Sequence, residues 1–375
     1  MLGVIDVLVF LAGGAVVLAT LGSAIRTVVL PRAVPARLGS VVFVTIRRLF
    51  DLRIGRAASY ERRDRMMAPY APVALLTLAF TWLGIVFVAY GAMFWALREG
   101  SVREDITSSG SALLTLGFEH PGSLPTTFLA FSEALIGLTL LALLITYLPS
   151  LYAAFSARES EVALLEVRAG SPPSGVAIIE RYALINWLGG LASIWGRWER
   201  WFVDVEESHT SHPSLVFFRS PQPDQSWITA AGAVLDAAAL TASSLLEHDP
   251  DARLCLRAGY IALGRIAGFF GIPVDPNPKP DDPISVTRDE FDAAYDRMVA
   301  AGVSVRTDRD QAWKDFAGWR VNYDHTLLTL AALTMAPYAP WSSDRSSRFR
   351  VSALRGRRFS QHGAPDIHRN ELPGS

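Results

Sequence analysis

The chain has 375 residues, 50% of them hydrophobic, and a formal net charge of −1 at pH 7. A chain so close to neutral lacks the excess of positive charge that nucleic-acid-binding proteins carry, so we expect no nucleic-acid partner. The single cysteine, Cys255, excludes an intramolecular disulfide and a multi-cysteine metal cluster.

Three stretches with almost no charged side chains predict membrane spans. Residues 7–25 and 66–97 carry no charge, and between 121 and 157 the only charged residue is Glu133. About 20 apolar residues are needed to cross the hydrocarbon core as a helix. We therefore expect transmembrane helices at about 3–25, 70–97 and 126–154.

The distribution of charge predicts how these spans are oriented. Residues 26–65 contain ten arginines and three acidic residues, whereas 98–126 contain two arginines and four acidic residues. Loops rich in positive charge stay in the cytoplasm. We expect a multi-pass protein of the cell membrane, with its N-terminus outside and its C-terminal region in the cytoplasm.

Other features of the first 65 residues refine this prediction. Asp6 stands where a signal peptide would be positive, so we expect the first span to be retained. The apolar run 41–50 is too short to cross, and we expect it along the headgroup boundary, with Arg47 and Arg48 near anionic lipid.

The lysine and arginine residues of the whole chain are strongly biased. All except Lys279 and Lys314 are arginine, a bias typical of GC-rich bacterial genomes.

The segment between the second and third spans has an unusual composition. Residues 104–127 are too apolar in the middle for a solvated loop and too short for another pair of crossings. Asp105, Thr107 and Ser108 are residue types that begin helices, so we expect a short helix from Ile106 to Thr115. A re-entrant loop fits this pattern if its backbone is covered by protein or lines a wet cavity.

This segment resembles the two-transmembrane pore module of potassium channels over about residues 75–158. In that family a pore helix is followed by a filter of the type T-V-G-Y-G, and then by an inner helix. Thr115 corresponds to the filter threonine, Leu116 to the valine, Gly117 to the first glycine and Phe118 to the tyrosine. The resemblance implies that four copies assemble as a homotetramer, whose carbonyl oxygens replace the hydration shell of the ion.

The segment departs from the family pattern at two positions. Glu119 replaces the second filter glycine, and His120 replaces the aspartate that follows. Glycine permits backbone angles that other residues resist, so selectivity for potassium stays open. Four Glu119 carboxylates around an axis would form an acidic ring, which favours cations.

Three further residues are candidates beside the filter. Glu133 lies inside a predicted span, where a charge is costly and usually functional. It either braces the pore helix through Ser108, Ser109 or Ser111, or faces the cavity. Gly137 either permits a close approach of the pore helix, acts as a hinge, or is a plain packing glycine.

The remaining residues predict a helical cytoplasmic domain. Candidate helices are 157–169, 174–207, 225–247, 250–270, 287–301 and 308–336, with no dinucleotide or phosphate-binding motif among them. The stripe Trp187, Trp195, Trp198 and Trp201 predicts a bundle core, with the membrane surface as the alternative. His209 and His212 have the spacing of a metal pair, but we expect neither a metal site nor a cofactor. The basic tail from Ser342 predicts disorder.

Together these features predict an all-α membrane protein with three transmembrane helices, a re-entrant pore loop and an all-α cytoplasmic domain. The expected function is that of a cation channel, with the lipid bilayer and other copies of the chain as partners and no enzymatic activity. Two alternatives stay open: a membrane-anchored signalling or interaction protein that does not conduct, and a membrane-bound enzyme. The expected parts are an N-terminal transmembrane helix (1–30), an Arg-rich cytoplasmic linker (31–67), a pore module (68–157), a helical domain (158–341) and a tail (342–375).

Overall fold

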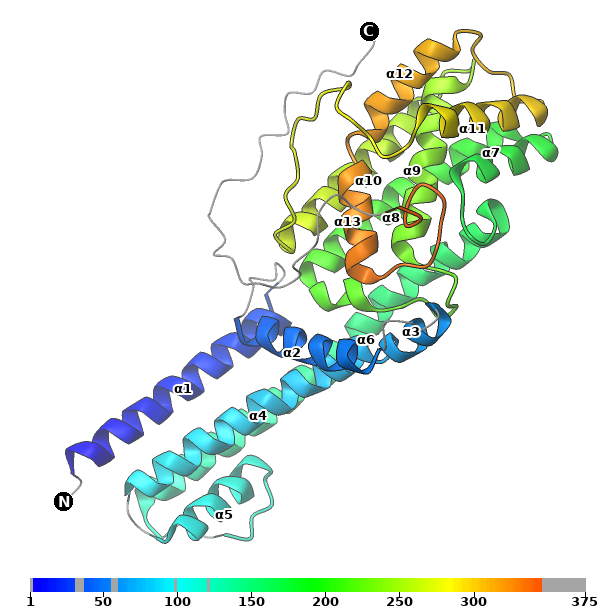
Figure 1. Ribbon diagram of the computed structural model, residues 1–375. Coiled ribbons are helices and arrows are strands. Elements are labelled where there is room, and N and C mark those ends of the chain that lie inside the picture. Colours follow the sequence, from blue (N-terminus) through cyan, green and yellow to red (C-terminus); the bar gives the residue numbers. More distant parts are fainter. Residues whose placement is uncertain (1–2, 31–36, 55–59, 98–99, 120–121, 346–375) are drawn as a thin grey trace. The chain divides into compact units, whose positions relative to one another are not determined.

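A computed structural model describes residues 3–30, 37–54, 60–97, 100–119 and 122–345 (Figure 1). It confirms that the chain is all-α: no strand occurs within these residues, apart from an isolated bridge between Leu245 and Val305. The chain forms two compact units. The first comprises Met1–Ala58, Met66–Ala154 and Ser211–Phe218, and the second Ser59–Arg65, Phe155–Thr210 and Arg219–Ser375. His120 and residues 346–375 of the predicted tail lie outside the described residues.

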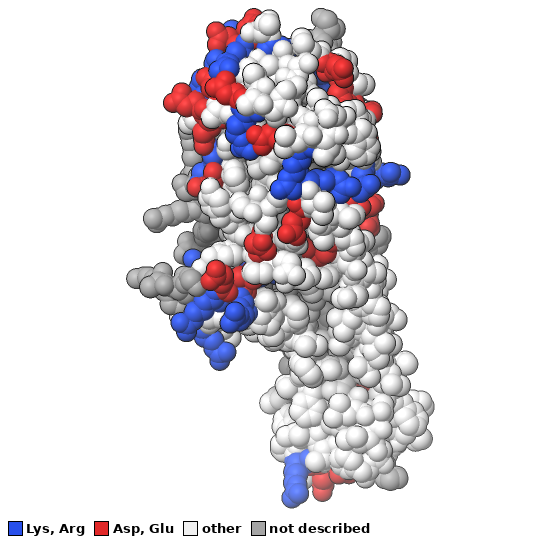
Figure 2. Space-filling model, turned by 90° about the vertical axis from the view of Figure 1, so that its right-hand side faces the viewer, with Lys and Arg blue, Asp and Glu red and all other residues white. Residues whose placement is uncertain are grey.

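The first unit contains the predicted membrane spans. Its elements are α1 (Val4–Val28), α2 (Arg37–Arg53), α4 (Tyr70–Leu97), α5 (Val102–Leu113), the first part of α6 (Leu124–Ala169) and the 3₁₀ helix η2 (Pro213–Phe217). Three helical stretches, Val4–Val28, Tyr60–Leu97 and Leu124–Ala169, are long and apolar enough to cross a membrane. Figure 2 shows an almost uncharged surface over much of one face of this unit. These findings indicate a multi-pass membrane protein.

Close packing of α1 against α4 forms the centre of this unit. A Cβ atom added at Gly13 would lie 2.5 Å from Cγ of Met93 and 3.0 Å from the carbonyl oxygen of Ala89. Only glycine lets the two helices approach so closely at this level. The indole Nε1 of Trp82 donates a hydrogen bond to Ser23 Oγ at 3.4 Å, which joins the same two helices further along.

The third predicted span proved shorter than the helix that contains it. The sequence predicted separate helices at about 126–154 and 157–169, whereas α6 runs without interruption from Leu124 to Ala169. Pro149 lies inside it. Proline removes one hydrogen bond of the helix ladder, but the helix continues on both sides of it.

The second unit is built around α9 (Trp227–Ser244), in which every residue is buried. The helices α7 (Gly175–Leu184), α10 (Pro250–Phe269), α12 (Arg309–Arg320) and α13 (Asp324–Thr334) pack against it, and α11 (Arg288–Ala300) packs against α7. The unit also contains α8 (Leu191–Ser211), most of α3 (Tyr60–Met67) and the 3₁₀ helix η1 (Leu188–Gly190).

Two of the predicted cytoplasmic helices are each divided in two. The stretch 174–207 is interrupted between α7 and α8, where Asn186 has a φ of +52° and Trp187 stacks on Tyr182. Trp187 is therefore outside the tryptophan stripe and 55% exposed, whereas Trp195, Trp198 and Trp201 are core residues as predicted. The stretch 308–336 is interrupted after Arg320.

A buried ionic cluster joins α9 to α12 and α13. The Arg320 guanidinium pairs with Asp236 of α9, donates to Asp324 Oδ1 at 2.7 Å and donates to the Trp341 carbonyl oxygen at 2.5 Å. Burial opposes the charge of this guanidinium, but the two carboxylates hold the pKa of Arg320 above its usual range. Burial also raises the pKa of Tyr323, whose hydroxyl donates to Asp236.

The start of the predicted tail is ordered. Ser342 is buried, and Arg345 donates to Glu290 Oε1 at 2.8 Å and to the Ser285 carbonyl oxygen at 2.7 Å. The predicted disorder therefore does not apply to residues 342–345, because Ser342 is buried and Arg345 finds acceptors on the helical unit.

Candidate functional site

The short helix α5 begins four residues earlier than the sequence predicted. Ser101 caps it, and Glu104 completes a reciprocal pair: Ser101 Oγ accepts from the Glu104 amide at 3.4 Å, and Glu104 Oε2 accepts from the Ser101 amide at 2.8 Å. This capping box satisfies two amides that would lack partners at a helix start. Thr107, predicted as a helix-start residue, instead lies inside α5 and bonds back to the Arg103 carbonyl oxygen.

A buried polar contact fastens α5 to both neighbouring long helices. Ser109 Oγ lies 2.6 Å from Glu133 Oε1 of α6 and 3.0 Å from the Phe87 carbonyl oxygen of α4. Ser109 and Glu133 are both fully buried. Of the alternatives for Glu133, the structure shows the brace, and it selects Ser109 from the three candidate serines.

We expect Ser109→Ala to destabilise the first unit by about 1–3 kcal/mol, because it removes the partner of a buried carboxyl group. The second oxygen of that group, Glu133 Oε2, already has no hydrogen-bond partner in the described part of the chain. Thermal unfolding of the detergent-solubilised protein, followed by tryptophan fluorescence, measures the effect. Ser108→Ala on the same helix is the matched control, and an equal loss in both variants would contradict this account.

Gly137 permits the C-terminal end of α5 to touch α6. A Cβ atom at this position would overlap the carbonyl oxygen of Leu113 and would lie 3.2 Å from its Cδ1. Of the alternatives for Gly137, the structure shows the close approach of α5.

The segment Thr115–Glu119 emerges directly from this end of α5. The Leu116 amide donates to the Ser111 carbonyl oxygen at 2.8 Å and the Thr115 amide to the Ala112 carbonyl oxygen at 3.0 Å, with Thr115 at a φ of +55°. This is a Schellman motif, which usually places glycine at the left-handed position. A β-branched residue in that conformation costs of order 1–3 kcal/mol.

Ser111 holds the filter-like segment in place. Its side-chain oxygen accepts from the amide of Phe118 at 3.2 Å and from the amide of Glu119 at 3.4 Å. Gly117, between the motif and this anchor, has a φ of +71°, the region that glycine adopts readily. Ser111 was named from the sequence as a candidate brace, but its role as a backbone anchor was not predicted.

The apolar side chains of this segment are uncovered in the single chain. Leu116 and Phe118 are both 59% exposed, Leu114 just before the segment is 60% exposed, and Glu119 is partly buried. The carbonyl end of a helix carries partial negative charge, and here it lies next to this segment. The arrangement places negative potential beside an apolar loop, which suits a cation better than an anion.

One further contact was missed by sequence reasoning. The Tyr90 hydroxyl lies 3.0 Å from Ser132 Oγ and joins α4 to α6 immediately before Glu133. A tyrosine within a span gives no indication of its partner, so this pairing could not be predicted from the sequence.

Each histidine of the predicted metal pair has its own contacts within its unit. His209 lies on α8, where its Nε2 is 3.0 Å from the buried Arg158 guanidinium and its Nδ1 is 3.1 Å from Ser208 Oγ. His212 belongs to the first unit, where its ring meets Tyr147. No group of three potential metal ligands occurs among the residues that the structure describes.

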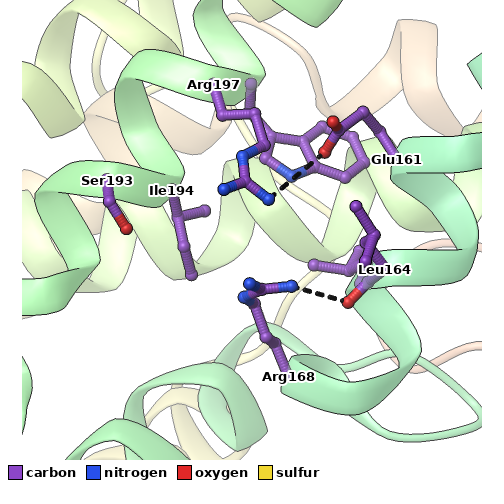
Figure 3. Close-up of a pocket in the computed structure, with 8 residues that line it drawn as sticks. Glu161, Leu164, Arg168, Ser193, Ile194 and Arg197 are labelled. Carbon is purple, nitrogen blue, oxygen red and sulfur yellow. Dashed lines mark hydrogen bonds and ion pairs between the residues drawn. The ribbon is translucent and has the colours of Figure 1, made fainter. Parts of the chain in front are cut away.

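A shallow pocket of the second unit is shown in Figure 3. Arg197 pairs with Glu161 at 3.8 Å, and Arg168 donates to the Leu164 carbonyl oxygen at 2.9 Å. The Ser193 hydroxyl donates to the Gly190 carbonyl oxygen at 2.7 Å. Arg168, Arg197 and Ser193 are thus each engaged within the unit.

Comparisons of the chain with protein-family models, with curated proteins and with solved structures found no match.

Proposed function

We propose that the chain is a passive cation channel that assembles as a homotetramer, with the N-terminus outside and the second unit in the cytoplasm. Thr115, Leu116, Gly117, Phe118 and Glu119 would form the filter, and the first part of α6 would line the pore. The observation that carries the proposal is the attachment of α5. This short helix is fastened by side chains to α4 and α6, and its carbonyl end opens into the filter-like segment.

The proposed assembly is supported by the filter-like segment, which a single chain leaves exposed. Backbone that is neither helix nor strand is tolerated at membrane depth only if protein covers it or water reaches it. One loop cannot enclose an axis, whereas four loops can, with one apolar segment from each copy. The exposure of Leu116 and Phe118 supports such contacts between copies.

Cation flux into liposomes tests the proposal directly. Purified protein is reconstituted into vesicles loaded with a thallium-sensitive dye, and potassium and sodium gradients are then compared. Thallium entry above that of empty vesicles is the expected result. Absence of flux from protein with normal elution and helicity would favour the alternative, a membrane-anchored signalling or interaction protein that does not conduct.

We expect Glu119→Gln to lower the cation current several-fold, because it removes four negative charges from the proposed ring at the outer end of the filter. Glu119→Gly should instead change the ratio of potassium to sodium permeability. Single-channel recording in planar bilayers measures both quantities. Glu247→Gln, an exposed substitution in the second unit, is the control, and currents unaltered by either Glu119 substitution would remove this residue from the proposed filter.

A further inference from the structure

One face of α2 combines arginines with exposed aliphatic side chains. Arg37, Val41, Thr45, Arg48 and Leu52 follow one another at intervals of three or four residues, so they share one side of the helix. All five are exposed, Val41 by 60% and Leu52 by 83%. Such a face joins positive charge with aliphatic surface, as helices that lie in a membrane interface do.

The other side of α2 is fixed to α4. Val42 is buried there, and the Tyr70 hydroxyl donates to the Phe43 carbonyl oxygen at 3.1 Å. The Tyr70 ring also meets the rings of Phe43 and Phe50 edge-on. Because these contacts fix the rotation of α2 about its own axis, the arginine-bearing face points away from α4.

The position of α2 along α4 places this face at the edge of the bilayer. Tyr70 is the first residue of α4, and a Cβ at Gly39 would lie 3.8 Å from Cδ2 of Leu78, two turns further along. Figure 1 shows α2 crossing α4 near this end. A helix beside the first turns of a membrane span lies at the level of the headgroups and the upper part of the acyl chains.

The arginines of α2 differ in what they already contact. Arg47, which the sequence placed near anionic lipid, pairs with Asp51 at 3.3 Å and lies 5.4 Å from the centre of the Tyr70 ring. Arg37 and Arg48 form no ion pair within the described residues. Their guanidinium groups are available to phosphate, whose geometry they match with paired hydrogen bonds.

We propose that this face of α2 binds the headgroups of anionic phospholipids, with Arg37 and Arg48 on the phosphates and Val41 and Leu52 among the upper acyl carbons. Long arginine side chains reach a phosphate layer while their stems cover apolar surface. The alternation of arginine and aliphatic side chains along this face matches the boundary between the charged headgroups and the hydrocarbon of a bilayer. It does not match a dry contact with a second copy of the chain, which would bury both guanidinium groups without a counter-charge.

Lipid binding in neutral detergent tests the role of the two arginines. Binding of a fluorescent short-chain phosphatidylglycerol to the full chain is measured by titration at low salt. Each arginine near an anionic surface accounts for about fivefold in affinity, so Arg37→Gln with Arg48→Gln should raise the Kd about 25-fold. Arg103→Gln with Arg200→Gln removes the same charge at exposed sites elsewhere and should leave the Kd within about twofold. Equal losses in the two double variants would overturn the proposal.

The depth of Leu52 gives an independent test that requires no conduction. Cys255 is fully buried, so the unmodified chain serves as the unlabelled blank. Leu52→Cys is labelled with bimane and reconstituted into vesicles of phosphatidylglycerol whose acyl chains are brominated near the headgroup. We expect strong quenching there, and none for the exposed control Ala192→Cys of the second unit. Equal quenching at both sites, or a disulfide between two copies of Leu52→Cys, would overturn the proposal.

Discussion

Replacing Arg320 with methionine is expected to destabilise the second unit by about 3–5 kcal/mol, because it leaves buried carboxylates without their counter-charge. Arg320 and Asp236 are 0% and 1% exposed, and Asp324 of α13 shares the same guanidinium. Methionine keeps much of the volume of the side chain but pairs with neither carboxylate. Thermal unfolding followed by tryptophan fluorescence measures the loss, since Trp195, Trp198 and Trp201 report from the core of this unit.

An exposed ion pair of the same unit supplies the control for Arg320. Arg309 pairs with Asp296, and the two side chains are 36% and 63% exposed. Exposed pairs contribute about 0–1 kcal/mol, so Arg309→Met should change unfolding little. Similar effects of the two substitutions would show that the buried cluster does not hold the helices together. Arg320→Lys adds a second comparison, because lysine keeps the charge but cannot match the forked contacts.

Gly137→Ala is expected to displace α5 from α6 and to remove cation flux. The added Cβ would overlap the Leu113 carbonyl oxygen. Because this is a backbone atom, it can move away only if the C-terminal end of α5 moves with it. Overpacking of this kind costs about 1–3 kcal/mol. The movement would also shift the Thr115–Glu119 segment, because that segment is bonded to the last turn of α5. Unfolding temperature and thallium flux are measured on the same preparation.

Gly84→Ala is the matched control for Gly137. It lies in α4, and nothing is within 4 Å of the Cβ it would add. Alanine favours helix over glycine by about 1 kcal/mol, so this variant should be as stable as the parent or more stable. Full flux in Gly137→Ala, with its unfolding temperature unchanged, would contradict the close approach.

The sequence predicted the helical class and the three spans because long uncharged runs are a strong signal. It placed the short helix α5 but missed its start, since Ser101 and Glu104 form a capping box that was read as part of a charged loop. It also joined α7 to α8, because the left-handed Asn186 and the stacking of Trp187 on Tyr182 depend on tertiary contacts.

The sequence predicted which residues lie in the candidate site, but not which of them contact one another. A carboxyl group within a span predicts a partner, and Glu133 was assigned three possible serines. Which serine it meets depends on the rotation of α5, and this in turn depends on Phe87 and on the approach at Gly137. The role of Ser111 as an anchor for two amides depends on a left-handed threonine, which local propensity disfavours.

The complete burial of α9 has a consequence for how the second unit opens. Because every residue from Trp227 to Ser244 is covered by other parts of the unit, α9 has no side from which it can fray into solvent. Its amide hydrogens can reach water only when the surrounding helices separate together. The slowest deuterium exchange in the protein should therefore occur in α9, and its rate would report the cooperative opening of the whole unit.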